Sequence, residues 1–256
     1  MIVAVIQARM GSRRLPGKVL LDLKGKPDLW HVVTRVSRAK KIDKIVVATT
    51  TLPEDCQIEE LCQRENIDVF RGSVDDVLDR FYQAVSNLQK QGNKIEFVVR
   101  ITADCPLIDP EIIDAVIDRI KEGNYDYVSN VIPPTYPDGL DVEVFTVNAL
   151  KDAYEHAQLT SDREHVTPFI INSGSLKKSN ISHSVDLSSL RWTLDEPEDY
   201  EFIRQIFNYL YDQNPRFTMS DVLHLLTTHP ELQRINKKFL RNEGYQRSLE
   251  NDAVNT

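Results

Sequence analysis

The sequence predicts an α/β protein in which a mostly parallel central sheet lies between two layers of helices. Short β-branched runs alternate with longer stretches of helical spacing through the first half of the chain, and the runs are apolar throughout. Such runs are typical of strands buried on both faces, because helices cover both sides of a parallel sheet. The length of 256 residues suits one large domain with a substantial core.

The elements are expected in a regular order. Strands are predicted at residues 2–6, 44–49, 67–70, 96–101 and 125–130, and a half-exposed strand at 140–144 follows an Asp-Gly turn. Helices are predicted at residues 27–40, 54–65, 74–91, 146–157, 161–172, 197–211 and 219–227. Asp55 and Ser73 are candidate helix N-caps. The last dozen residues are polar and are expected to fray.

Two parts of the chain follow from this pattern. Residues 1–212 are expected to form the α/β domain, with an inserted β-hairpin near the Asp-Gly turn. Residues 213–256 are expected to form a C-terminal helical extension, either within the same domain or appended to it.

Composition and charge exclude several classes of protein. The net charge of −8 disfavours binding to nucleic acid or to anionic membranes. No apolar run approaches the roughly 20 residues that cross a bilayer. The N-terminus has the pattern of a buried strand and not of a signal peptide. Cys56, Cys62 and Cys105 form no CxxC pair, so they are expected to be reduced thiols of a cytoplasmic protein.

The strongest local signal is QARMGSRRLPGKVL, residues 7–20, which directly follows the first predicted strand. Guanidinium groups, an ammonium group and backbone amides at glycines are the groups that a triphosphate requires. Neither GxxxxGK[ST] nor GxGxxG is present, and a solvated basic loop is the alternative. The candidate residues are Arg9, Gly11, Ser12, Arg13, Arg14, Gly17 and Lys18.

Two aspartates are candidate magnesium ligands. Asp104 lies in RITADCPLIDP and Asp195 in RWTLDEPEDY, each after a strand-like run. Magnesium is usually held by one or two carboxylates plus substrate phosphates, and strand ends meet at one rim of the sheet. The alternatives are a turn residue for Asp104 and a helix N-cap for Asp195, since Pro197 is near a helix start.

Two further segments could recognise the substrates. In FRGSVDDVLDRFYQA, residues 70–84, we expect base and ribose recognition, with an exposed Asp76–Arg80 ion pair as the alternative. YPDGLDVEVF and SDREHVTPF could bind a hydroxylated, carboxylated substrate; the alternatives are a capping box at Ser161 and Glu164, and a structural His165. The substrate candidates are Asp138, Asp141, Glu143, Arg163, Glu164 and His165.

Taken together, these blocks resemble the cytidylyltransferases that activate 3-deoxy-octulosonate and acylneuraminate sugars, and most closely the spore coat polysaccharide biosynthesis protein F family. The resemblance covers nearly the whole chain. It rests on IQARMGSRRLPGKVL, VFRGSVDDVLDRFYQA, RITADCPLIDP, YPDGLDVEVF and the tail HPELQRIN…RNEGYQRSL.

The resemblance implies a Rossmann-like nucleotide-diphospho-sugar transferase fold, with residues 1–212 as the nucleotidyltransferase domain. It implies transfer of CMP from CTP to an acidic sugar with release of pyrophosphate, Mg2+ as cofactor, and a homodimer as one form of assembly. Asp104 and Asp195 would hold the metal. The implied catalytic residues are Arg9, Lys18, Asp104 and Asp195. The implied nucleotide-binding residues are Ala8, Arg9, Met10, Gly11, Ser12, Arg13, Lys18, Arg71, Asp79, Arg80, Thr102 and Asp104.

Two other functions remain possible on the sequence. One is a glycosyltransferase that uses a finished nucleotide-sugar, since one fold serves both reactions. Such enzymes commonly carry a DxD metal motif, and the nearest match is Asp141-Val142-Glu143. The other is a non-catalytic binding subunit, against which the full set of basic and acidic site residues argues.

Overall fold

Strands and helices alternate along residues 1–241 and 243–254, the part of the chain that the computed structural model describes. The strands are β1 (Ile2–Gln7), β2 (Asp22–Leu23), β3 (Lys26–Pro27), β4 (Lys44–Thr50), β5 (Asp68–Gly72), β6 (Phe97–Thr102), β7 (Tyr127–Ser129), β8 (Glu143–Thr146) and β9 (Lys178–Asn180). The helices are α1 (Asp28–Val36), α2 (Cys56–Arg64), α3 (Val77–Lys90), α4 (Pro110–Gly123), α5 (Val147–His156), α6 (Thr160–His165), α7 (Pro168–Asn172), α8 (Pro197–Leu210), α9 (Met219–Thr228) and α10 (Glu243–Val254). Short 3-10 turns are η1 (Lys18–Leu20), η2 (Pro53–Asp55) and η3 (Leu232–Arg234).

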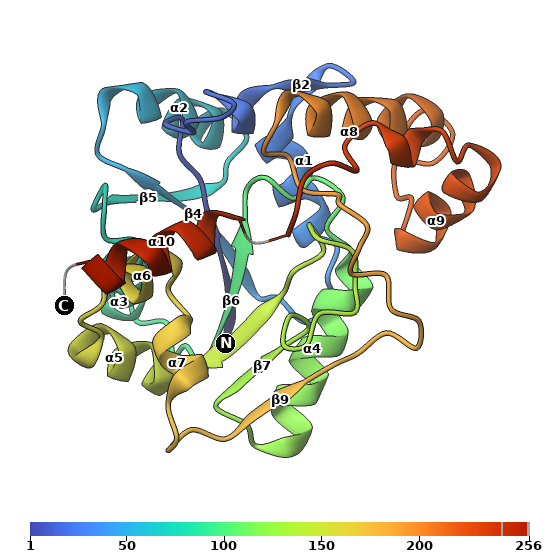
Figure 1. The fold of residues 1–256 in the computed structure, drawn as a ribbon. Helices are drawn as coiled ribbons and strands as arrows, with labels where there is room; N and C mark the ends of the chain where they lie inside the picture. The colour runs from blue at the N-terminus through green and yellow to red at the C-terminus, as the bar shows by residue number, and fades with distance from the viewer. Residues whose placement is uncertain (242, 255–256) are drawn as a thin grey trace.

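The central sheet has the strand order β5-β4-β1-β6-β8-β7-β9. The first four strands of that order run parallel, as do β7 and β9, whereas β8 is antiparallel to both of its neighbours. The carboxyl ends of β1, β4, β5 and β6 therefore meet at one rim, where α/β sheets bind ligands (Figure 1). A separate two-stranded ribbon, β2–β3, was not expected from the sequence.

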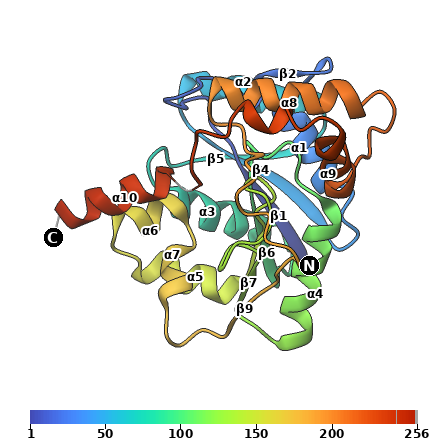
Figure 2. The same cartoon turned by 45° about the vertical axis from the view of Figure 1, so that its right-hand side comes forward.

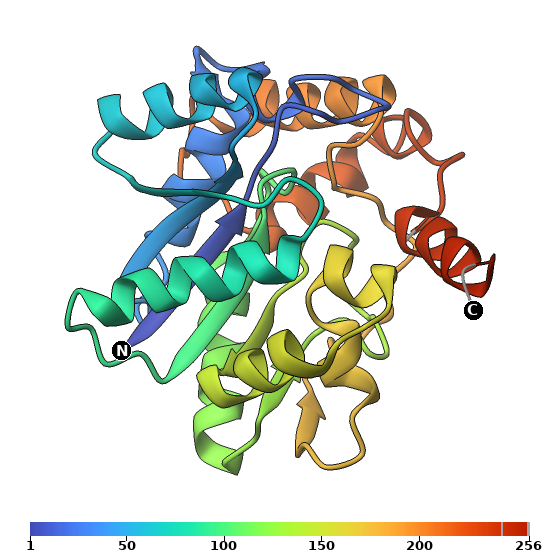
Figure 3. The same cartoon turned by 90° about the vertical axis from the view of Figure 1, so that its left-hand side faces the viewer.

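Helices cover both faces of this sheet, so the predicted three-layer architecture is confirmed. Side chains of α1, α2, α4, α8 and α9 join one apolar cluster, and those of α3, α5 and α7 join the other. In β1, Ile2, Ala4 and Ile6 enter the first cluster while Val3 and Val5 enter the second. Figure 3 shows α3 and α5 lying across the second face.

Several boundaries differ from the expectation for local reasons. The sequence pattern missed α4, although Pro110 is its first residue and the carboxylate of Asp109 caps it by accepting Glu111 N. The single helix expected at 161–172 is split into α6 and α7 at Val166, whose φ is 73°. The N-cap of α3 is Asp76 and not Ser73.

The strand expected to be half exposed, β8, is buried instead. Glu143 is only 5% exposed, because its carboxylate pairs with Arg100 at 2.5 Å and accepts the Tyr127 hydroxyl at 2.7 Å. The preceding Asp-Gly turn packs tightly on the chain at Trp192. Gly139 has a φ of 105°, and a Cβ there would lie 2.5 Å from the Trp192 carbonyl carbon.

The C-terminal part returns to the body of the molecule. Phe217, Val222 and Leu232 belong to the same apolar cluster as α8. Of the last dozen residues, which were expected to fray, 245–254 form most of α10, which lies beside α6 (Figure 2), and 255–256 lie outside the described residues. None of the helices within residues 1–241 and 243–254 has both the length and the apolar character of a membrane span.

Candidate active site

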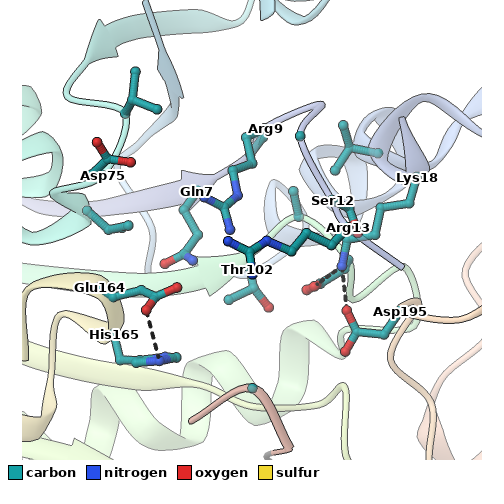
Figure 4. A pocket seen from close by; sticks show the side chains of 18 of the residues that line it. Gln7, Arg9, Ser12, Arg13, Lys18, Asp75, Thr102, Glu164, His165 and Asp195 are labelled. Carbon is teal, nitrogen blue, oxygen red and sulfur yellow. Dashed lines mark hydrogen bonds and ion pairs between the residues drawn. The ribbon is translucent and has the colours of Figure 1, made fainter. Parts of the chain in front are cut away.

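A cavity of about 810 Å³ opens at the rim formed by β1 and β6. Segments far apart in the sequence build its wall. They are the loop after β1, the start of α3, the loop after β6, Asp195 just before α8, and the helices α6 and α10. Figure 4 shows Lys18 and Asp195 at one end of this cavity, Glu164 and His165 at the other, and Arg9 between them.

The basic loop after β1 reaches the cavity as predicted. Its position is fixed by Asp55, whose carboxylate accepts Met10 N at 2.7 Å and Thr50 N at 3.2 Å. Asp55 is completely buried and, although it precedes α2, its side chain caps nothing there. Gly17, with φ 71°, closes the loop by donating to Met10 O at 2.9 Å. The loop residues that line the cavity are Ala8, Arg9, Gly11, Ser12, Arg13, Arg14 and Lys18.

Lys18 joins the two predicted magnesium ligands. Its Nζ lies 2.6 Å from Asp104 Oδ2 and 2.6 Å from Asp195 Oδ1, so these oxygens are within twice that distance of each other. Burial by itself lowers the pKa of Lys18, but the two carboxylates raise it above its ordinary value. Burial opposes ionisation of Asp104, but Lys18 lowers the pKa of that carboxyl to about 2. Lys18 and Asp104 are therefore both charged at neutral pH.

The backbone holds the two aspartates together despite their separation in the sequence. Asp104 O accepts Leu194 N at 2.8 Å, which joins the loop after β6 to the chain before α8. Asp195 is not the helix cap: Glu196 is the N-cap of α8, and Asp199 completes a capping box with it. The Asp195 carboxylate instead pairs with Arg14 at 2.9 Å.

This pair of carboxylates fits a hard divalent cation. Carboxylate oxygens suit Mg²⁺, and the Lys18 ammonium already places a positive charge between them. Within the described residues no group of three or more His, Cys, Asp or Glu side chains converges on a metal position. A cation here would therefore need substrate phosphates or water to complete its shell.

The predicted base-recognition residues divide between two environments. Arg80 lines the cavity, and burial, followed by the charge of Arg9, lowers its pKa to about 10. Arg71 is used structurally, since it donates to Thr50 O and Leu52 O and pairs with Glu59 at 2.9 Å. Asp79 is on α3 outside the cavity lining and accepts a hydrogen bond from the Gln83 amide.

Two more site expectations, for Arg163 and Met10, are corrected. The Asp76–Arg80 ion pair, which was the alternative to base recognition, gives way to another, because Asp76 pairs with Arg163 of α6 at 2.6 Å while Arg80 donates to Ser73 O. This contact also takes Arg163 out of the cavity lining. Met10, which was predicted to bind the nucleotide, does not line the cavity. Its side chain packs against the apolar cluster that includes α1 and α8.

The three acids near the Asp-Gly turn do not reach the cavity. Each is held by an arginine: Asp138 by Arg191 at 3.4 Å, Asp141 by Arg241, and Glu143 by Arg100. Burial and the neighbouring Asp141 raise the pKa of Asp138 to about 7. The expectation that these acids bind substrate is therefore replaced by a structural role in the described fold.

Glu164 and His165 do line the cavity, from α6. The capping box at Ser161 and Glu164, which was the alternative to substrate binding, is absent from α6, whose N-cap is Leu159 with no side-chain hydrogen bond. Burial lowers the pKa of His165, so the imidazole is neutral at pH 7. Thr102, also predicted, lines the cavity beside Asp104.

Sequence reasoning missed other parts of the wall. Gln7 ends the apolar β1 with a polar side chain, and that break in the pattern could have been noticed; its buried Oε1 finds no partner among the described residues. The tail block RNEGYQRSL contributed to the resemblance, but its sequence alone did not indicate a place in the site. The missed lining residues with polar groups include Gln7, Asp75, Thr160, Arg247 and Ser248.

Comparisons with known proteins agree with this geometry. The profile of the cytidylyltransferase family matches residues 3–214. Spore coat polysaccharide biosynthesis protein SpsF of Bacillus subtilis is 33% identical over 240 residues, covering 90% of this chain and 95% of SpsF. A cytidylyltransferase structure from Leptospira borgpetersenii has 31% identity and a TM-score of 0.83, covering 90% of this chain and 95% of that chain. A CMP:2-keto-3-deoxy-manno-octonic acid synthetase solved with CTP shares the fold, at 17% identity and a TM-score of 0.62, covering 81% and 98%.

A mostly parallel sheet covered on both faces, with a cavity at the carboxyl ends of its strands, is typical of α/β proteins that bind a ligand at that rim. The chain belongs to the cytidylyltransferase family and is a nucleotidyltransferase. The resemblance drawn from its sequence blocks is thereby confirmed, and the non-catalytic alternative is set aside.

Proposed function

We propose that this enzyme transfers CMP from CTP to an acidic sugar, of the nonulosonate or 3-deoxy-sugar acid type, and releases pyrophosphate. The sugar would serve surface polysaccharide biosynthesis, as the likeness to the spore coat protein suggests. One observation carries the proposal: the last cation of the basic loop, Lys18, meets both Asp104 and Asp195 inside one cavity.

The residues of the cavity suit displacement of pyrophosphate by a sugar hydroxyl. The anomeric hydroxyl forms the new P–O bond at the α-phosphorus while the bond to pyrophosphate breaks. Arg9, Arg13 and the loop amides would hold the triphosphate and stabilise the charge that develops on the leaving group. Lys18 would donate hydrogen bonds to the same phosphates. Such transfers depend on positioning and charge neutralisation, and no covalent nucleophile is required.

Asp104 and Asp195 would hold Mg²⁺, which is the cofactor we assign. When bound, it neutralises phosphate charge and lowers the pKa of a coordinated hydroxyl. CTP is made in the cytoplasm, so we place the reaction there. The free thiols of Cys56, Cys62 and Cys105 are compatible with that compartment.

The experiment that tests this function is a pyrophosphate-release assay. The four nucleoside triphosphates are each combined with Mg²⁺ and with a panel of acidic sugars, and the products are identified by mass. We expect pyrophosphate and a CMP-sugar with CTP alone. Consumption of a finished nucleotide-sugar with release of free nucleotide, and no reaction with CTP, would establish the glycosyltransferase alternative instead.

A further inference from the structure

The helix α10 forms part of the cavity wall although it lies beyond residues 3–214, the range matched by the family profile. Gly244, Arg247 and Ser248 line the cavity together with Glu164 and His165 of α6. Figures 1 and 2 both show α10 lying beside α6. A segment outside the common family range that borders the cavity is well placed to determine which substrate the cavity accepts.

One end of α10 is anchored on the start of α6. Asp252 accepts the Ser161 amide with both carboxylate oxygens, at 3.1 and 3.3 Å. The first amides of a helix lack partners within the helix, and Leu159, the N-cap of α6, offers no side-chain acceptor. Asp252 therefore supplies from another helix the cap that α6 lacks. Ser161 and Asp252 are both buried by this contact.

A second contact, one helical turn closer to the cavity, links both helices through Ser248. Its Oγ lies 2.9 Å from Glu164 Oε2 and 2.9 Å from His165 Nε2. Because a carboxylate only accepts, the Ser248 hydroxyl donates to Glu164, and His165 Nε2–H then donates to the Ser248 oxygen. This fixes the tautomer of the neutral imidazole and leaves Nδ1 as its hydrogen-bond acceptor. The edge of the His165 ring also meets Tyr245, with ring centroids 5.0 Å apart.

The chain is also held just before α10. Arg241 pairs with Asp141 and donates to Tyr136 O at 3.1 Å. Asp141 is one of the acids that the sequence assigned to substrate binding, and in the structure it anchors the segment leading to α10. The helix is thus tied down on both sides of its cavity-facing residues.

We propose that α10 is the acceptor wall of the active site, and that the Arg247 guanidinium binds the carboxylate of the acidic sugar. Arg247 is the cation that α10 adds to the cavity lining, and a guanidinium binds a carboxylate through two parallel hydrogen bonds. The phosphate-binding cations Arg9, Arg13 and Lys18 come from a different segment, the loop after β1. This inference rests on the proposed function and adds to it the helix and the residue that would bind the sugar acceptor.

The test combines a substitution with a change in the substrate. Arg247→Gln is assayed for pyrophosphate release with CTP, Mg²⁺ and either 3-deoxy-manno-octulosonate or N-acetylneuraminate, and with the methyl ester of each acid. We expect KM for the free acid to rise at least about ten- to a hundredfold, since one charge-assisted hydrogen bond is worth that much and Arg247 would make two. KM for CTP and the rate with the ester stay unchanged. The matched control is Gln246→Ala, the neighbouring residue of α10, which is not among the cavity-lining residues.

Asp252 tests the anchoring of the helix separately. Asp252→Ala removes the acceptor for Ser161 N, so we expect faster hydrogen exchange in α10 and a higher KM for the acid. Asp252→Asn keeps a side-chain oxygen for that amide and restores most of both properties. Asp252 acts here as a positioning residue. The hydrogen-exchange measurement detects the loss of its contact with α6 independently of the enzyme assay.

The outcomes distinguish this inference from the proposed function. Wild-type activity combined with an unchanged acid KM in Arg247→Gln would overturn the acceptor wall and leave the function standing. A rise in KM for CTP instead of the acid would place Arg247 in the nucleotide site and overturn the assignment equally. Absence of pyrophosphate from the wild type with every acid would refute the proposed function, and the acceptor wall with it.

Discussion

The proposed nucleotide side and the proposed acceptor side of the cavity are built in different ways. On the nucleotide side, functional groups directly follow β1 and β6, and the parallel strands bring those loops to one rim. On the acceptor side, the wall comes from α6 and α10, which are joined by hydrogen bonds between residues over 80 positions apart. A site that follows strand ends can be found by pattern, whereas one assembled from distant helices depends on the whole fold.

The largest expected effect concerns the carboxylates where the two sides meet. Asp104→Asn should lower turnover by at least about a hundredfold, since removing one charged group at a reacting phosphate costs on the order of an oxyanion-hole donor. The measurement is the rate of pyrophosphate release at saturating CTP. Asp195→Asn should lower turnover similarly. Asparagine could replace a helix cap at little cost, but Asp195 caps no helix, so the lost charge is what the substitution tests. Asp118→Asn, at a half-buried ion pair outside the cavity lining, is the control. Retained turnover in either site variant would show that the paired carboxylates are not the centre of the site.

Lys18→Met should have the next largest effect. We expect a ten- to hundredfold weaker interaction with CTP, about the worth of one charge-assisted hydrogen bond. The variant also removes the ammonium between Asp104 and Asp195 and leaves the pairing of Arg14 with Asp195 in place, so its melting temperature should fall without metal and recover on addition of Mg²⁺. If the melting temperature of Lys18→Met did not change on addition of Mg²⁺, that result would argue against a metal position between the two acids.

A smaller effect is expected from the residue that holds the basic loop. Asp55→Ala removes the acceptor of Met10 N and leaves buried donors unpaired, at a cost of roughly 1–3 kcal/mol in unfolding free energy. KM for CTP should rise while KM for the acidic sugar stays the same. Chemical denaturation and steady-state kinetics measure the two effects. An equal rise in both KM values would mean that the two sides are not separately organised.

The smallest expected effect on turnover is at Asp28, where we expect a change in stability alone. This residue is fully buried, and neither carboxylate oxygen has a hydrogen-bond partner among the described residues. Burial, and then the charge of Asp104, raise the pKa of Asp28 well above 3.8. The folded protein therefore holds a proton that the unfolded chain has lost, and stability falls as pH rises above about 4, by about 1.4 kcal/mol per pH unit until the folded pKa is reached.

Asp28→Asn lacks that titration. The variant should match the wild type near pH 4 and exceed its unfolding free energy increasingly toward neutral pH. Urea denaturation at several pH values measures the difference. If the difference in unfolding free energy between the wild type and the variant did not change with pH, Asp28 would have a partner or an ordinary pKa.

The sequence by itself determined the fold class, the succession of strands along the first half of the chain, and the groups on the loop after β1. These follow from local causes: apolar strands, helical spacing, and the rule that parallel strands end at one rim. It also indicated Asp104 and Asp195, because each follows a strand-like run.

Only the tertiary structure decided which polar residues became structural and which reached the cavity. Asp138, Asp141 and Glu143 look like ligand-binding acids in the sequence, but arginines from distant segments neutralise them. Residues 245–254, whose polar character predicted fraying, form most of α10. They are held there because Asp252 caps α6 and Ser248 bonds to the last turn of α6. The physical reason is common to both cases: the partner of a charged or capping group is chosen by proximity in space, and proximity between residues a hundred positions apart is set by the packing of the whole chain.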